Sequence, residues 1–211
     1  FRDRKLVDID YIPDEDRIVG RGEQIQKVAD EVAPLLSGAP GNSVLIFGKT
    51  GTGKSLVAKH VMARLQAEGR RHDTAIGTAY VNCSQTPSTP RVIRNIGQVL
   101  SSTGDTVAFP NRGISTDEYY ERLWRLIDAQ FDGVVVTLDE VDMLKDDNPL
   151  MVLSRAGESG SVDVPISIIA ISNKINYREQ MNQRTKSSFG HREFVFDPYD
   201  AEQLREILEN R

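Results

Sequence analysis

The eight residues from Gly48 to Ser55, with the sequence GKTGTGKS, constrain the fold of this chain more than any other stretch. They follow an apolar run at 44–47 and precede a segment, 56–65, with helix-like character. Strand, glycine-rich loop and helix are the context in which the pattern G-x-x-x-x-G-K-[ST] binds phosphates. Glycines let the backbone bend so that successive N–H groups and a helix N-terminus point at one anion. The loop predicts a site for a phosphate chain, and the alternative is a glycine-rich turn without a ligand.

Two side chains of this loop have specific expected roles. Lys54 would reach the terminal phosphates, and the hydroxyl of Ser55 would coordinate Mg²⁺. We therefore predict ATP or ADP and Mg²⁺ as cofactors. The residues expected to hold the nucleotide are Gly48, Lys49, Thr50, Gly51, Thr52, Gly53, Lys54, Ser55 and Leu56.

Composition excludes several classes of protein. No apolar run approaches the roughly 20 residues that cross a bilayer, and there is no targeting segment, so we expect no membrane partner. Cys83 is the only cysteine, so a disulfide within the chain is impossible and a cytoplasmic location is expected. The net charge of −5 argues against a domain that coats nucleic acid non-specifically. Any contact with nucleic acid must therefore be local.

Strand-like and helix-like segments alternate along the chain, which predicts an α/β fold with helices on both faces of a doubly wound sheet. Strands are expected at 44–47, 79–81, 134–138, 166–171 and 193–196, and helices at 22–36, 56–65, 91–100, 115–131, 149–156 and from 200 onward. A polar turn is expected at 69–73. Residues 101–115 suggest an inserted loop, and Ser115 with Glu118 forms a capping-box pattern. The last helical pattern has no terminating Gly or Pro, so we expect the chain to continue beyond Arg211.

The run VVVTLDEVD, residues 134–142, supplies the second chemical signal. Ligands of open parallel sheets sit beyond the carboxyl ends of the strands, which would place Asp139 and Glu140 beside the terminal phosphate. Asp139 would hold Mg²⁺ or its water shell, and Glu140 would accept a proton from the attacking water. The alternative is an acidic pair that only caps the next segment.

Asn173 supplies the third signal, because it ends the next apolar strand. From there its amide could orient the water or touch the terminal phosphate. The alternative is an asparagine that only forms a turn.

The ordered set GKTGTGKS, LDEVD and an apolar strand ending in Ser172–Asn173 resembles the AAA+ ATPases, with Asn173 at their sensor-one position. Further segments resemble the archaeal origin-recognition and cell-division-cycle replication initiators: DYIP at 10–13, IVGR at 18–21, YVNC at 80–83, GIS at 113–115, LSRA at 153–156, KSSFG at 186–190 and FVFDPY at 194–199. The resemblance covers nearly the whole chain.

This resemblance implies an AAA+ P-loop base domain over 22–211, preceded by an N-terminal arm, 1–21, that contributes to the adenine pocket. Its five-stranded parallel sheet would have the order 5-1-4-3-2, with helices on both faces. A helical lid and a winged-helix domain would follow beyond Arg211.

Three groups of residues take roles from the resemblance. Tyr11, Ile12, Ile18 and Val19 match the segment that holds adenine, although structural packing is the competing explanation. The stretch from about Asp105 to Ser115 matches an insertion that touches origin DNA, with Arg112, Gly113 and Ile114 as contact candidates and Phe109 and Pro110 as added apolar surface; a solvated loop with a buried Phe109 is the alternative. Arg184 lies where relatives place a basic residue that reaches a neighbouring subunit's phosphate, but the second basic position of eukaryotic relatives is Ser188 here.

The function that these residues and the resemblance imply is ATP-dependent initiation of DNA replication. The initiator would bind origin double-stranded DNA, associate with the nucleoid, act with other initiator copies and recruit the replicative helicase, with slow ATP hydrolysis to ADP and phosphate as a switch. Two alternatives are an AAA+ protein remodeller or chaperone, and a nucleotide-binding scaffold in which Glu140 is idle.

Overall fold

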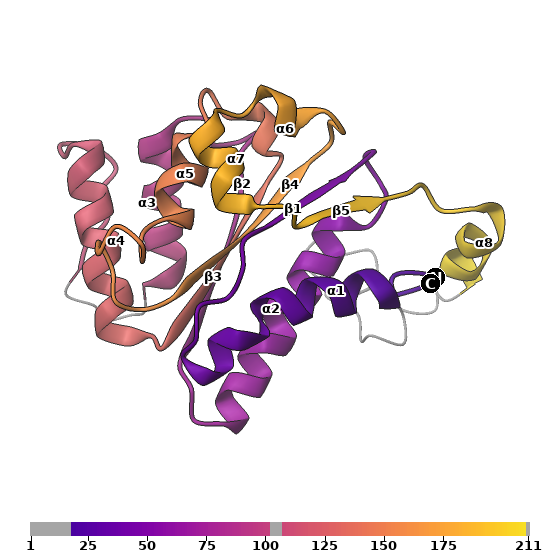
Figure 1. Ribbon diagram of the computed structural model, residues 1–211, viewed down its shortest axis with the longest axis horizontal. Coiled ribbons are helices and arrows are strands. Elements are labelled where there is room, and N and C mark those ends of the chain that lie inside the picture. The colour runs from indigo at the N-terminus through magenta and orange to yellow at the C-terminus, as the bar shows by residue number, and fades with distance from the viewer. Residues whose placement is uncertain (1–17, 102–106, 210–211) are drawn as a thin grey trace.

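A computed structural model describes residues 18–101 and 107–209 (Figure 1). Its centre is one sheet of five parallel strands in the order β2-β3-β4-β1-β5. The strands are β1 Val44–Gly48, β2 Ile76–Asn82, β3 Gly133–Asp139, β4 Ile166–Ser172 and β5 Glu193–Phe196. This order is the predicted 5-1-4-3-2 order counted from the other edge, so the predicted fold class is confirmed.

Helices cover both faces of the sheet (Figure 1). One face carries α1 Gly22–Val32, the 3-10 helix η3 Ala33–Ser37 and α2 Lys54–Arg71. The other carries α3 Thr89–Leu100, α4 Thr116–Gln130, α5 Asn148–Ser154 and α7 Gln183–Phe189. The remaining elements are the 3-10 helix η4 Val141–Met143 and the helices α6 Tyr177–Gln180 and α8 Ala201–Glu209.

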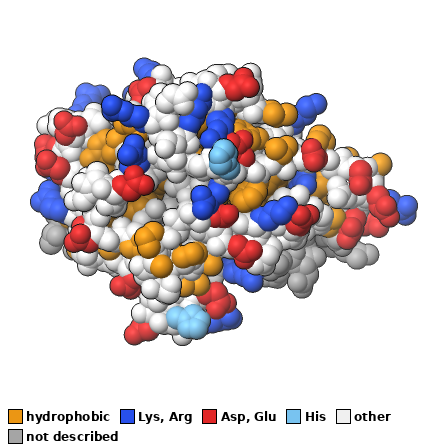
Figure 2. Space-filling model, viewed as in Figure 1, with side chains coloured by type: hydrophobic (Ala, Val, Ile, Leu, Met, Phe, Trp, Pro, Cys, Tyr) orange, Lys and Arg blue, Asp and Glu red, His pale blue; other side chains and the backbone are white. Residues whose placement is uncertain are grey.

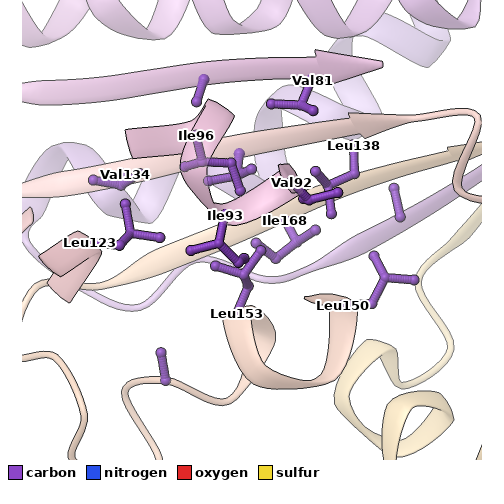
Figure 3. Packing of buried hydrophobic residues seen from close by; sticks show 14 of the residues in the cluster. Val81, Val92, Ile93, Ile96, Leu123, Val134, Leu138, Leu150, Leu153 and Ile168 are labelled. Carbon is purple, nitrogen blue, oxygen red and sulfur yellow. The ribbon is translucent and has the colours of Figure 1, made fainter. Parts of the chain in front are cut away.

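The continuous apolar runs become central strands because both of their faces are buried. In β1, the side chains of Leu45 and Phe47 join the cluster beneath α3, α4 and α5, whereas Val44 and Ile46 join the cluster beneath α1 and α2. Strand β3 is buried along its whole length. Figure 3 shows side chains of α3, α4 and α5 meeting those of β2, β3 and β4 in the first cluster.

Several predicted boundaries differ from those observed. Helix α2 continues to Arg71, whereas a turn was expected from Gly69. A Cβ atom at Gly69 would lie 2.8 Å from the backbone oxygen of Thr74, so this glycine permits a close approach inside the helix. The turn comes instead at His72 and Asp73, and Asp73 has a φ of 55°. The helices α6 and α7 were not predicted because each spans barely one or two turns.

The segment between α3 and α4 is fixed to both helices over its described part, 107–115. Phe109 is 7% exposed and lies against Gly97 of α3. The predicted cap of α4 is present, because the hydroxyl of Ser115 accepts a hydrogen bond from the backbone N–H of Glu118 at 3.1 Å. Phe109 is therefore part of the core, and the apolar surface expected of it is absent from the described part of this segment.

Candidate nucleotide-binding site

The carboxyl ends of β1, β3 and β4 border a cleft of about 280 Å³. Residues that are far apart in the sequence meet there, as the motif order predicts for one edge of a parallel sheet. The residues lining the cleft are Thr50, Gly51, Gly53, Lys54, Ser55, Leu56, Asp139, Glu140 and Asn173. All nine belong to the residue set predicted from the sequence.

The loop of residues 48–55 depends on glycine at two close approaches. A Cβ atom at Gly48 would lie 2.5 Å from the backbone oxygen of Phe196, and one at Gly53 would lie 2.5 Å from the hydroxyl of Tyr199. Gly53 also has a φ of 85°, which L side chains rarely adopt. Thr52 is buried and its hydroxyl donates to the backbone oxygen of Lys49 at 2.9 Å, which braces the loop from within.

Lys54 is held by the loop that it follows. Its ammonium group donates to the backbone oxygens of Gly48 and Lys49, each at 2.8 Å. Burial lowers the pKa of Lys54, and the carboxylates of Asp139, Asp142 and Glu140 oppose this shift. An ammonium group with two backbone acceptors retains a third N–H for a phosphate oxygen.

Asp139 is the centre of a converging set of donors. Its Oδ2 atom accepts hydrogen bonds from the hydroxyls of Ser55, at 2.5 Å, and Tyr80. Its Oδ1 atom accepts from the backbone N–H of Glu140 at 2.8 Å. Burial and the bond to Asp139 raise the pKa of Tyr80, so the phenol remains a donor. The hydroxyl and carboxylate oxygens of Ser55 and Asp139 fit Mg²⁺, a hard cation that binds a few protein oxygens and keeps its other positions for water and phosphate.

Glu140 adopts a backbone conformation that is uncommon for a residue other than glycine. Its φ and ψ are 55° and 47°, in the left-handed region. Such conformations cost on the order of 1–3 kcal/mol and cluster at functional sites. The turn brings the carboxylate of Glu140 toward β4, where Oε1 lies 3.5 Å from the amide nitrogen of Asn173. The acid and the amide therefore face the same part of the cleft.

Asp142 links the two strands that carry this pair, a role that the sequence did not predict. Its Oδ1 atom accepts from the hydroxyl of Ser172 at 3.0 Å and from the backbone N–H of Asn173 at 3.2 Å. The ammonium group of Lys174 lies 3.9 Å from Oδ2. Displacing η4 would thus displace Asn173. Asp142 belongs to the quoted motif LDEVD, but nothing in that motif indicates which strand it contacts.

Arg21 is a second residue that motif reasoning missed. It is 4% exposed, and its guanidinium donates to the backbone oxygens of Thr52 at 3.0 Å and Asp197 at 2.6 Å. The group lies 4.2 Å from the ring centroid of Tyr199, within range of a cation–π interaction. Arg21 thereby ties the loop to the segment that follows β5. Its place in IVGR, 18–21, was the one available signal.

The other predicted site residues lie outside the cleft or outside the described residues. Ile18 and Val19 are buried, and Ile18 packs in the cluster with α1 and α2. Tyr11 and Ile12 lie outside the described residues, as do Asp105 and Thr106 of the inserted loop. Arg184 is exposed on α7. Arg112 and Ile114 line a different cleft, of about 510 Å³, next to α3.

The cleft combines a phosphate-type loop, oxygen donors for a metal and an acid–amide pair.

In the described part of the chain, no helix is both long and apolar enough to cross a membrane.

Comparisons with known proteins identify the family of the chain. The family model described as AAA ATPase domain matches residues 17–169. ORC1-type DNA replication protein 17 of Haloarcula marismortui is 54% identical over 211 residues, which is all of this chain and 52% of that protein. ORC1-type DNA replication protein 2 of Halobacterium salinarum is 46% identical, across all of this chain and 80% of that protein.

A solved structure is similar over nearly the same extent. The structure of the Aeropyrum pernix ORC1 protein in complex with DNA is 32% identical, with a TM-score of 0.84, over 99% of this chain and 52% of that one. The chain thus spans about half the length of several of the proteins it matches.

Proposed function

The chain belongs to the AAA ATPase domain family and to the ORC1-type DNA replication proteins, and we propose that it is the ATP-binding part of a replication initiator. In this proposal, ATP binding and slow hydrolysis to ADP and phosphate act as a switch. The nucleotide state sets how the whole protein holds origin DNA and recruits the replicative helicase, together with other initiator copies. The proposed location is the cytoplasm, in association with the nucleoid.

One observation carries the proposal: Lys54, Ser55, Asp139, Glu140 and Asn173 line a single cleft although they come from three strand ends. A structural loop that bound no nucleotide would not need an acid and an amide facing the same space. The family membership supports an ATPase capacity for this cleft.

Each residue has a proposed part in hydrolysis. The loop amides and Lys54 bind the phosphates, and Ser55 and Asp139 hold Mg²⁺. The metal, when bound, neutralises charge on the phosphate oxygens. Glu140 accepts the proton of the attacking water, which contributes about 10²–10⁴ in rate, and Asn173 orients that water. The left-handed turn at Glu140 presents the base to the cleft.

Residues outside the cleft complete the proposal. Ile18 and Val19, with Tyr11 and Ile12, are proposed to flank the adenine as part of an arm at 1–21, before an ATPase base domain at 22–211. Arg184, exposed on α7, is proposed to reach the nucleotide of a neighbouring copy. Arg112, Gly113 and Ile114 are proposed to contact DNA. The similarity to the Aeropyrum pernix ORC1 protein, whose structure is in complex with DNA, supports a DNA partner without assigning residues.

Two substitutions separate binding from hydrolysis. Glu140→Gln should keep the ATP affinity and lower turnover by about 10²–10⁴, because only the proton acceptor is lost. Lys54→Ala should lose nucleotide binding itself, because the phosphates lose their cation. Equilibrium binding of a fluorescent ATP analogue and phosphate release measure the two effects. Normal turnover by Glu140→Gln would show that the assigned base is wrong.

The DNA contact has its own test. Origin and random duplexes are titrated with the full-length protein and with its Arg112→Ala variant. We expect weaker binding and a shorter footprint for the variant, because one exposed phosphate contact is removed. Unchanged affinity and footprint would remove this segment from the DNA interface.

A further inference from the structure

A second cleft lies apart from the nucleotide site, between the start of α3 and the segment 111–114. Its volume is about 510 Å³, and its lining contains three arginines, Arg91, Arg94 and Arg112, and no carboxylate. We propose that these arginines form one groove that binds backbone phosphates of duplex DNA. The inference rests on the proposed DNA role and deepens it, because Arg91 and Arg94 had no assigned function.

Among residues 18–101 and 107–209, no carboxylate neutralises the charge of the groove through an ion pair. No described residue forms an ion pair with any of the three arginines; Arg94 only donates to the side-chain oxygen of Asn95, at 3.1 and 3.4 Å. The nearby Glu118 is engaged with Arg122 at 2.7 Å. Because the chain has a net charge of −5, three uncompensated guanidinium groups in one hollow mark a local site for an anion.

The spacing of the arginines argues against an incidental arrangement. Arg91 and Arg94 are three residues apart on α3, so their side chains are neighbours on one face of the helix. Like charges at this spacing repel and destabilise a helix unless a counter-charge lies between them. Figure 2 shows acidic and basic side chains interspersed over the face that it presents, without a continuous basic surface.

The opposite wall of the groove is held in place before any ligand arrives. The hydroxyl of Tyr119 donates to the backbone oxygen of Pro110 at 2.5 Å. The side-chain amide of Gln98 donates to the backbone oxygen of Phe109 at 3.1 Å. Arg122 donates to the backbone oxygen of Ala108 at 2.7 Å. These bonds tie the segment to both α3 and α4. Arg112 is thus carried on a preformed wall facing Arg91 and Arg94.

Phosphodiester oxygens suit this groove because guanidinium groups bind phosphate in a forked geometry. The groove also contains the uncharged donors Ser88 and Asn111, which are typical of contacts to phosphate and sugar. Such contacts fix the position of the protein on the duplex and carry no base preference. The groove would hold the backbone of the DNA, with Ile114 as part of its lining.

The test is the salt dependence of duplex binding by the full-length protein and its Arg91→Ala/Arg94→Ala variant. Each phosphate contact contributes about 1 to the slope of log affinity against log salt, so the variant's slope should be shallower by about 2. If both proteins bind equally at 1 M salt, a slope difference of about 2 corresponds to about 40-fold weaker binding by the variant near 0.15 M salt. The loss should be equal on origin and random duplexes.

Two matched variants control for the loss of charge and for the position of the arginines. Arg91→Lys/Arg94→Lys keeps both charges and should restore most of the slope. Arg70→Ala removes an exposed arginine from α2, on the other face of the sheet, and should leave the slope unchanged. Thermal unfolding checks that all variants fold.

The double alanine variant could show an unchanged slope and affinity while the unaltered protein binds duplex normally. That result would show that the groove does not bind DNA phosphates, and the proposed DNA role would remain. A loss confined to the origin duplex, with an unchanged slope, would also overturn the proposed groove, since that pattern indicates base contacts. If the unaltered protein bound no duplex, the proposed DNA function itself would fail.

Discussion

Removing the hydroxyl of Tyr80 tests whether the metal-binding carboxylate is positioned by its neighbours. In Tyr80→Phe, Asp139 loses one of three donors, and the bonds from Ser55 and from the backbone of Glu140 remain. A hydrogen bond to a charged group is worth about 1.5–3 kcal/mol. We take the lower end, about 1.5 kcal/mol, because two donors persist. That free energy corresponds to about a tenfold change, within the usual range for residues that support a metal ligand.

The assay is ATP hydrolysis as a function of Mg²⁺ concentration, with nucleotide affinity in EDTA measured alongside. Tyr80→Phe should raise the Mg²⁺ concentration for half-maximal activity about tenfold and leave metal-free nucleotide affinity within about twofold. A merely structural tyrosine would alter stability without moving the Mg²⁺ curve.

Tyr120→Phe is the matched control for this experiment. Tyr120 is also a buried tyrosine, on α4, and its hydroxyl has no hydrogen-bond partner among the described residues. Its removal should leave the Mg²⁺ curve in place. If the Mg²⁺ curves of Tyr80→Phe and the unaltered protein superimposed, metal binding by Asp139 would not depend on Tyr80.

Three further predictions concern other parts of the molecule. Arg21→Ala should weaken nucleotide binding and lower the free energy of unfolding by about 2–3 kcal/mol, because one buried and one part-buried charge-assisted bond to backbone oxygens are lost; chemical denaturation and nucleotide titration check this. Gly97→Ala should cost about 1–3 kcal/mol, because the new Cβ would lie 2.2 Å from the ring of Phe109, whereas Gly157→Ala, with open space around it, should be neutral in the same denaturation assay. Burial, with smaller contributions from Asp139, Glu140 and Asp142, raises the pKa of Cys83 to about 12, which favours the neutral thiol, so the folded protein should resist iodoacetamide from pH 7 to 9; rapid alkylation without unfolding would contradict this.

The parts of the site that could be predicted from sequence are those whose chemistry is local. The segment Gly48–Ser55 can be identified from the sequence because a phosphate loop needs its glycines, lysine and hydroxyl at fixed spacing. Asp139, Glu140 and Asn173 follow because acids and amides at the ends of apolar strands share one sheet edge. These residues do line one cleft, and their roles stay predictions.

Arg21, Tyr80 and Asp142 could not be predicted because their partners are distant in the chain. The bond between Tyr80 and Asp139 spans 59 residues, and the bond between Arg21 and Thr52 spans 31. Such contacts depend on which strands pair. The register places Asn82 opposite Asp139, which brings Tyr80, two residues earlier, within reach of that carboxylate.

Predicted helix ends were wrong where a contact with a distant part of the fold outweighed the local preference of a residue. Gly69 indicated a turn by its type, yet it lies inside α2 because the chain after the helix packs closely against it. Pro34 ended α1 earlier than the apolar pattern suggested, since the chain there tightens into the 3-10 helix η3. Apolar periodicity alone cannot distinguish these outcomes.

In the proposed function, the nucleotide in this cleft sets how tightly the whole protein holds DNA. The most direct test of this proposal is the affinity of the full-length Glu140→Gln protein for origin duplex, measured with ATP and with ADP at the same salt concentration. We expect a clear difference in affinity between the two nucleotides, and we expect Lys54→Ala to abolish that difference. Equal affinity with ATP, ADP and no nucleotide would contradict the proposal.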